Sequence, residues 1–180
     1  METWEAIRSR RNVRSYSDQS IPADHLDEIL EAGRRAPSSQ NWQPWDFVVV
    51  TDRPALISLS EVQGAGGAGH VASAAAAVAL VAAAGGSAAG GSAAGRSERR
   101  LYFDLGQAAM SLMLAAAGLR IGSCHAGVTD QDLARRVLGL PPDRFCAYVL
   151  SFGYPADRPL SLIRYPDRRP SPEVIHRGTW

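Results

Sequence analysis

Residues 9–16 read SRRNVRSY and hold three guanidinium groups within five positions: Arg10, Arg11 and Arg14. A planar guanidinium presents a rigid fork of donors that fits two oxygens of a phosphate or carboxylate at once. In an extended segment alternate side chains share a face, so Arg10, Asn12 and Arg14 would converge on one anion. Val13, on the other face, would enter the core. The simplest alternative for such an octapeptide is a solvated basic patch.

The charge balance argues against two classes of protein. The 180-residue chain is long enough for one domain with a substantial core, and it carries 19 basic and 18 acidic residues, a formal net charge of +1. Proteins that bind nucleic acid or a membrane surface normally show a clear basic excess, so we expect neither partner. The chain has no lysine, which makes the abundance of arginine by itself weak evidence of function.

Other features of the sequence predict a cytoplasmic protein. The longest apolar run, residues 71–84, is shorter than the ~20 residues that a membrane span requires. The first residues include an early acid and lack the apolar stretch of a secretion signal. Cys124 and Cys146 are too few for a disulfide framework, and with four scattered histidines they give no metal-ligand spacing. We therefore expect free thiols and no metal site.

Hydrophobic periodicity predicts helices at residues 3–8, 22–36, 54–62, 99–119 and 129–138, and strands at 46–51, 76–84 and 145–153. Trp4 and Ile7 are expected to face inward from the first helix, and the strand at 46–51 to be buried. Thr129 and Asp132 are expected to cap the last helix. The helix at 99–119 is apolar on most sides. We predict that it lies in the core and also in a dimer interface, with the central helix of a monomer as the alternative.

Residues 36–45, APSSQNWQPW, form the most distinctive predicted loop. A loop that leads into a rigid strand is a common place for binding groups. This one offers hydrogen-bonding groups and apolar walls suited to a flat heterocycle: Ser38, Ser39, Asn41 and Gln43, with Pro37 and Trp42. A capping and turn loop is the alternative interpretation.

Three further segments are expected to be loops or flexible. Residues 121–125, IGSCH, are expected to form a loop, and residues 85–95 a flexible loop inside the domain. Residues 64–69, GAGGAG, match G-x-G-x-x-G, but a helix is predicted before them and no acid follows about 20 residues on, so we exclude a dinucleotide fingerprint. The Pro- and Arg-rich tail from residue 154 is expected to dock on a partner.

The order of these segments resembles the nitroreductase family of FMN-dependent oxidoreductases. The most specific parts are R-R-x-V-R and P-S-S-x-N-x-Q-P-W at their mutual distance. The resemblance implies a single α+β domain over residues 1–180, with a central mixed, mostly antiparallel sheet flanked by helices. It also implies an intertwined homodimer in which residues 156–180 wrap the partner subunit, with two FMN sites at the interface.

The resemblance also implies a set of FMN-binding residues. Those that would hold the phosphate and ribityl chain are Arg10, Arg11, Asn12 and Arg14, joined by Arg168 or Arg169. Those that would reach the flavin from the other subunit are Pro37, Ser38, Ser39, Asn41 and Gln43. Those that would run beside the isoalloxazine ring are Gly122, Ser123 and Cys124. Three positions depart from the family's pattern: Asn12 replaces a frequent serine, Arg120 a frequent glycine, and His125 an aromatic or acidic residue.

The implied activity is ping-pong transfer of hydride from NAD(P)H, through flavin N5, to a nitroaromatic, quinone or similar small acceptor. The cofactor supplies the chemistry, so no catalytic side chain is predicted. The alternatives are a flavin-binding protein that stores or sequesters FMN, a flavin-consuming enzyme of the same fold, and a structural dimer without flavin whose arginines only pair with acids such as Asp18 or Asp104.

Overall fold

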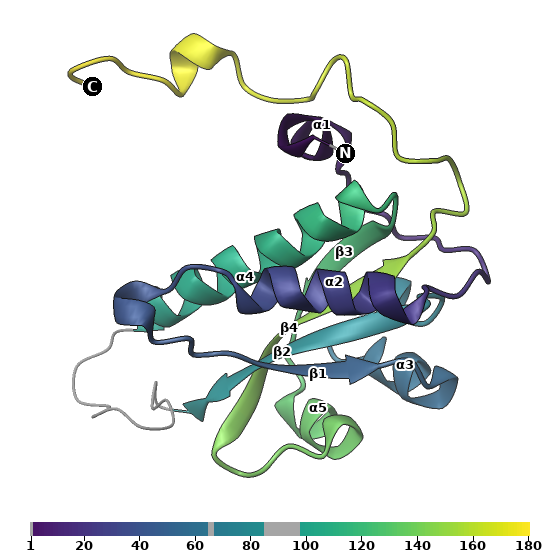
Figure 1. Cartoon of the computed structure of the whole chain (residues 1–180). Coiled ribbons are helices and arrows are strands. Elements are labelled where there is room, and N and C mark those ends of the chain that lie inside the picture. The colour runs from purple at the N-terminus through teal and green to yellow at the C-terminus, as the bar shows by residue number, and fades with distance from the viewer. Residues whose placement is uncertain (1, 65–66, 85–97) are drawn as a thin grey trace.

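The computed structural model describes residues 2–64, 67–84 and 98–180 (Figure 1). Its helices are α1 (Thr3–Ser9), α2 (Ala23–Arg34), α3 (Arg53–Leu59), α4 (Glu98–Gly118) and α5 (Gln131–Leu138). Its strands are β1 (Asp46–Val50), β2 (Ala76–Ala83), β3 (Gly122–Gly127) and β4 (Arg144–Gly153). The expected flexible loop at 85–95 and two residues of the glycine run, 65 and 66, lie outside the described residues.

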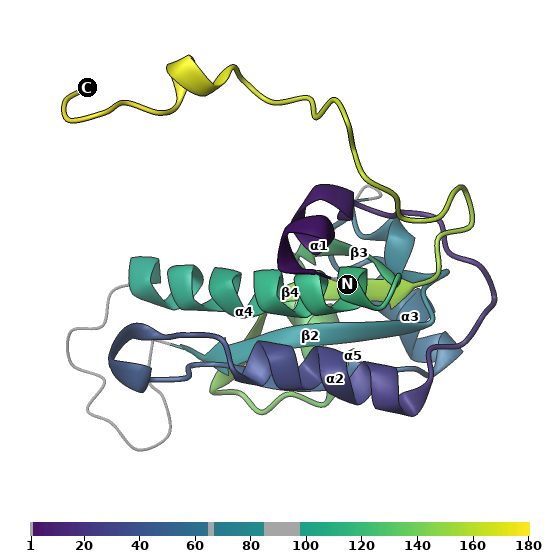
Figure 2. The same cartoon turned by 45° about the horizontal axis from the view of Figure 1, so that its top comes forward.

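Within these ranges the four strands form one sheet in the order β1-β2-β4-β3, and every neighbouring pair is antiparallel. Helices α2 and α4 cover one face, and α3 and α5 cover the other (Figures 1 and 2). The central strand β2 is buried along nearly its whole length, which explains why an alanine-rich segment forms a strand at all. The expected α+β fold is confirmed.

Two predictions about burial are wrong for the single chain. Strand β1 is half exposed, because it lies at the edge of the sheet and pairs only with β2. Trp4 and Ile7 face outward with exposed fractions of 66% and 45%. The small side chains Ala6 and Ser9 are buried in their place, because α1 packs closely on α4.

The predicted loop at 121–125 is also wrong, because residues from Gly122 onward form the edge strand β3. Their small side chains let two neighbouring segments approach closely. A Cβ atom on Gly122 would lie 2.6 Å from Cγ2 of Val13, and one on Gly153 would lie 2.8 Å from Cδ1 of Tyr16. The sequence gives no β-branched signal here, so the strand depends on pairing with β4.

The start of α5 is capped by a residue other than the predicted pair. The Asp130 side chain accepts a hydrogen bond from the Leu133 N–H at 2.8 Å. Thr129 instead donates its hydroxyl to the Val62 carbonyl at 3.3 Å. The capping box was therefore misplaced by one residue, although the helix itself is confirmed.

Helix α4 crosses the sheet and leaves an apolar outer surface. Leu105, Ala108 and Leu112 are buried, whereas Phe103 and Met110 are 68% and 43% exposed. Among the described residues, no helix combines the length and the hydrophobicity needed to cross a lipid bilayer.

The C-terminal tail is bound to the domain at its beginning only. The Ala156 N–H donates to the Ser15 carbonyl and the Ile163 N–H to the Arg8 carbonyl, both at 3.0 Å. Beyond Ile163 the tail runs away from the sheet (Figures 1 and 2), and Tyr165 and Trp180 are almost fully exposed.

Candidate functional site

The arginine segment, residues 10–14, is extended and bound to β3. The Val13 N–H donates to the Ser123 carbonyl at 3.0 Å, and Asn12 forms a parallel bridge with Ser123. Val13 is fully buried, while Asn12 and Arg14 are exposed and Arg10 is half-buried. The predicted alternation is therefore present, with Val13 in the core and the polar side chains on the outer side.

Arg11, unlike Arg10 and Arg14, binds the beginning of the C-terminal tail. Its Nη2 donates to Asp157 Oδ1 at 2.6 Å and to the Arg158 carbonyl at 2.8 Å. This contact holds the pKa of the Asp157 carboxyl below its usual range. Arg11 thus ties down the beginning of the tail, and its guanidinium is already committed.

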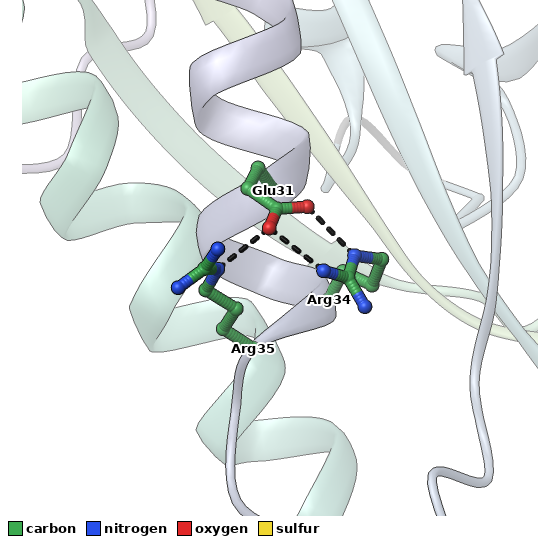
Figure 3. Close-up of polar contacts among 3 residues, drawn as sticks. All are labelled: Glu31, Arg34 and Arg35. Carbon is green, nitrogen blue, oxygen red and sulfur yellow. Dashed lines mark hydrogen bonds and ion pairs between the residues drawn. The ribbon is translucent and has the colours of Figure 1, made fainter.

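Arg10 and Arg14 have no carboxylate partner anywhere in the described ranges; Arg10 donates only to Asn12 Oδ1 at 3.3 Å. Arg34 and Arg35, in contrast, share a carboxylate partner. Both contact the Glu31 carboxylate at 2.6 Å (Figure 3), and they lower the pKa of that carboxyl to about 2.

Neither acid suggested for a purely structural role pairs with an arginine. No ion pair involves Asp18 or Asp104 within the residues that the structure covers. Asp104 is buried and accepts hydrogen bonds from the backbone of Ser39. Neither Asp18 nor Asp104 is thus such a partner in the described chain, although Arg11 does pair with another acid, Asp157.

Arg10 also lines a groove of about 660 Å³ in which several guanidinium groups gather. The arginines around it are Arg8, Arg10, Arg164 and Arg168, and the apolar walls are Trp4, Ile7, Met110, Leu114, Ile163 and Pro166. Arg169 does not line it. Of the two tail arginines, the structure thus places Arg168 among the residues that line the groove with Arg10.

Strand β3 presents its side chains to both faces of the sheet. Ser123 is opposite Phe152 and so faces α4, and its buried hydroxyl has no hydrogen-bond partner among the described residues. Cys124 lies on the opposite face, next to Ser151. Burial raises the pKa of the Cys124 thiol, which the charge of Arg14 only partly opposes.

Behind the arginine segment lies a buried polar network that the sequence did not reveal. The Tyr16 hydroxyl and His70 Nδ1 both lie 2.7 Å from Ser151 Oγ. Burial, and next to it the charge of Arg14, lowers the pKa of His70 to about 4, so the ring is neutral near pH 7. These residues come from three distant segments, and no local pattern could have grouped them.

The Pro-Ser-Ser loop, residues 37–43, forms the second cluster. Asp104 is 1% exposed, and both its oxygens accept the Ser39 N–H at 3.2 Å. The Gln43 N–H donates to Ser38 Oγ at 2.8 Å, and Gln43 Nε2 donates to Asn41 Oδ1 at 2.9 Å. Gln40, Asn41 and Gln43 have φ angles of 51–55°, a region that non-glycine residues seldom adopt outside functional sites.

The two clusters lie at opposite ends of α4 (Figure 1). The loop borders a cavity of about 560 Å³ against the first turns of the helix, whereas the arginine groove meets its second half. A 21-residue helix is roughly 30 Å long. One chain therefore does not bring the predicted site residues together, but divides them into two groups.

A model of the nitroreductase family matches residues 7–154. The chain belongs to the nitroreductase family. A protein of Archaeoglobus fulgidus, named provisionally as an NADH dehydrogenase/NAD(P)H nitroreductase, is 34% identical over 183 residues and 99% of each chain. An NADH dehydrogenase of Thermus thermophilus is 32% identical, with 91% of this chain and 92% of the relative covered.

Among solved structures, an FMN-dependent nitroreductase from Clostridium difficile superposes with a TM-score of 0.83 and 25% identity, covering 98% of this chain and 99% of the other. The family identified from the two loop motifs is thus confirmed, and the fold of this nitroreductase-family chain agrees with that of a solved relative.

Proposed function

We propose that this nitroreductase-family chain is an FMN-dependent oxidoreductase that passes hydride from NAD(P)H to a nitroaromatic, quinone or similar small acceptor. The observation that carries the proposal is the pair Arg10 and Arg14. Both guanidiniums lie beside β3 without a carboxylate partner in the described part of the chain. Arginine side chains without a carboxylate partner can form charge-assisted hydrogen bonds with the oxygens of a bound phosphate.

The residues fit FMN in a definite way. Arg10, Asn12 and Arg14 would hold the phosphate, and Arg168, which lines the same groove as Arg10, would join them. Arg11 is left out of this set, because Asp157 already occupies its guanidinium. We propose that Arg11 instead holds the beginning of the tail through its Nη2.

The flavin ring would run beside Gly122, Ser123 and Cys124 of β3. The buried Ser123 hydroxyl, which lacks a partner within the described residues, is free to bond to a polar edge of the ring. Bound FMN supplies the hydride chemistry, while the chain binds it and orients it. Burial raises the pKa of Cys124, which disfavours the thiolate, and the proposed function requires no nucleophile there.

We further propose that two chains form the site. The Pro-Ser-Ser loop (Pro37, Ser38, Ser39, Asn41 and Gln43) would reach the flavin of a partner subunit, because on its own chain it borders a cavity separate from the groove of Arg10. The exposed side chains of Trp4 and Met110 and the unsupported tail beyond Ile163 offer the contact surface. Cys124 and Cys146 are both free, which supports a cytoplasmic location.

An anaerobic stopped-flow titration of the FMN-loaded protein with NADH and with NADPH tests the activity. We expect the flavin absorbance to bleach with at least one donor and to recover when a nitroaromatic or quinone is added. A yellow protein that neither donor bleaches would instead be a flavin-binding protein without turnover. Loss of FMN itself, followed by chromatography, would indicate a flavin-consuming enzyme.

A further inference from the structure

The cavity beside the Pro-Ser-Ser loop has the size of a small-molecule site. Its volume is about 560 Å³, within the range of roughly 300–1,000 Å³ typical of ligand pockets. Pro37, Ser38 and Ser39 form one wall, and the first turns of α4 form the other. If two chains share the flavin, this cavity opens next to the ring, on the side where an acceptor must enter.

The only acid lining this cavity is already engaged. Asp104 is buried, and its oxygens accept the Ser39 N–H and, at 3.4 Å, the amide of Gln107. The carboxylate therefore fixes the loop and does not neutralise the cations at the rim.

Those cations are Arg99 and Arg100, two adjacent exposed arginines in the first turn of α4. Neither forms an ion pair with any acid that the structure describes. Arg34 and Arg35, which are also exposed and adjacent, are by contrast neutralised by Glu31. The rim of the cavity thus carries two positive charges that no ion pair in the described part of the chain offsets.

The remaining wall is aromatic. Phe103 lines the cavity and is 68% exposed, so its ring is available for stacking, and Pro37 adds a second apolar surface. A guanidinium fork binds a carboxylate through two parallel hydrogen bonds, and aromatic rings stack with an offset. Together these groups suit a flat aromatic ring that carries a carboxylate.

We propose that Arg99 and Arg100 bind the carboxylate of an aromatic acceptor, so that the enzyme reduces aromatic acids in preference to their neutral analogues. This rests on the proposed function, because the cavity borders the flavin only in the two-chain site. Arg99 and Arg100 determine specificity here and take no part in hydride transfer.

The test compares the wild type with R99Q/R100Q, using R34Q/R35Q as a matched control with the same change of charge. The acceptors are 4-nitrobenzoate and its neutral analogue 4-nitrobenzamide. We expect R99Q/R100Q to lower kcat/KM for the acid about tenfold, through KM, because a charge-assisted contact of about 1.4 kcal/mol is lost. The amide should change less than about twofold on the same scale, and the control should change neither.

Two results would overturn the proposal. One is a wild type that reduces the acid no better than the amide. The other is an R99Q/R100Q variant that loses only kcat/KM for NADPH relative to NADH, measured at a fixed acceptor concentration. The arginines would then bind the extra phosphate of NADPH and not the acceptor.

Calorimetry separates this proposal from the function on which it rests, since binding of benzoate and benzamide requires no turnover. If neither NADH nor NADPH reduced the flavin, the proposed reductase function would be contradicted, but the proposed carboxylate site would not. Selective benzoate binding that disappears in R99Q/R100Q would still support the anion site, whereas equal binding of benzoate and benzamide would contradict it.

Discussion

The arginine segment and the Pro-Ser-Ser loop are both rigid, but they are held in different ways. Backbone pairing with β3 holds the segment through Val13 and Asn12, which leaves the guanidiniums of Arg10 and Arg14 available. The loop has a strained backbone and is held by a side chain, the buried carboxylate of Asp104. The first arrangement leaves two guanidinium groups without a carboxylate partner among the described residues. The second fixes the backbone of one wall of a cavity.

The largest effect is expected from removing the prepared charge. R10A/R14A should weaken FMN binding at least about 100-fold, since each hydrogen-bonded charged contact contributes about 1.5–3 kcal/mol. R34A/R35A, which removes two arginines neutralised by Glu31, should leave FMN affinity unchanged. Fluorescence titration of FMN measures both variants, and unchanged affinity in R10A/R14A would refute the phosphate assignment.

The two regions should differ in how their contribution to folding stability depends on pH. Behind the arginine segment lies a titratable group with a shifted pKa, His70. Its folded pKa of about 4 is below the ordinary 6.5, so between pH 6.5 and 4 the unfolded chain binds a proton that the folded chain does not. Stability should therefore fall as pH falls through this window, by up to about 3 kcal/mol. Thermal melts from pH 7 to 4 should show a shallower slope in His70→Gln.

Near the Pro-Ser-Ser loop lies a titratable group with a shifted pKa, Glu31. Its contribution to folding stability changes over a lower pH range than that of His70. Its folded pKa of about 2 is below the ordinary 4.5, so its ion pairs stabilise the fold above pH 4.5 and are lost as pH falls toward 2. Glu31→Gln should leave the slope between pH 6.5 and 4.5 as it is in the wild type. A shallower slope there in Glu31→Gln, or an unchanged one in His70→Gln, would contradict this division.

A substitution of intermediate effect tests the backbone contact that holds the arginine segment. Gly122→Ala places a Cβ atom 2.6 Å from Val13 Cγ2, so we expect a loss of about 1–3 kcal/mol of stability. Gly118→Ala, where a Cβ atom meets nothing within 4 Å at the end of α4, should be neutral or stabilising by up to about 1 kcal/mol. Urea unfolding compares the two, and equal values would count against the close approach.

The smallest effect distinguishes two adjacent arginines of the tail. Arg168 lines the groove with Arg10, whereas Arg169 does not. Arg168→Ala should weaken FMN binding about tenfold, the loss of one charged contact, and Arg169→Ala should change it less than about twofold on that scale. Isothermal titration with FMN measures both, and the reverse order would move the phosphate contact to Arg169.

Local sequence patterns predicted most of the fold. The helices and the strands β1, β2 and β4 follow from periodicity, because burial of one face leaves its period in the chain. The alternation of Arg10, Asn12 and Arg14 around Val13 also depends only on backbone geometry. Even the family could be identified from two short motifs, because their residues and spacing are unusual together.

Only the tertiary structure decided which of these residues are available. Arg10 and Arg11 are neighbours of the same type, yet Asp157 engages one and not the other, and that acid is remote in sequence. Strand β3 forms because Gly122 and Gly153 let Val13 and Tyr16 approach, and Ser151 joins His70 to Tyr16 across the sheet. Such contacts join distant parts of the chain and leave no local period, so the sequence alone could not assign them.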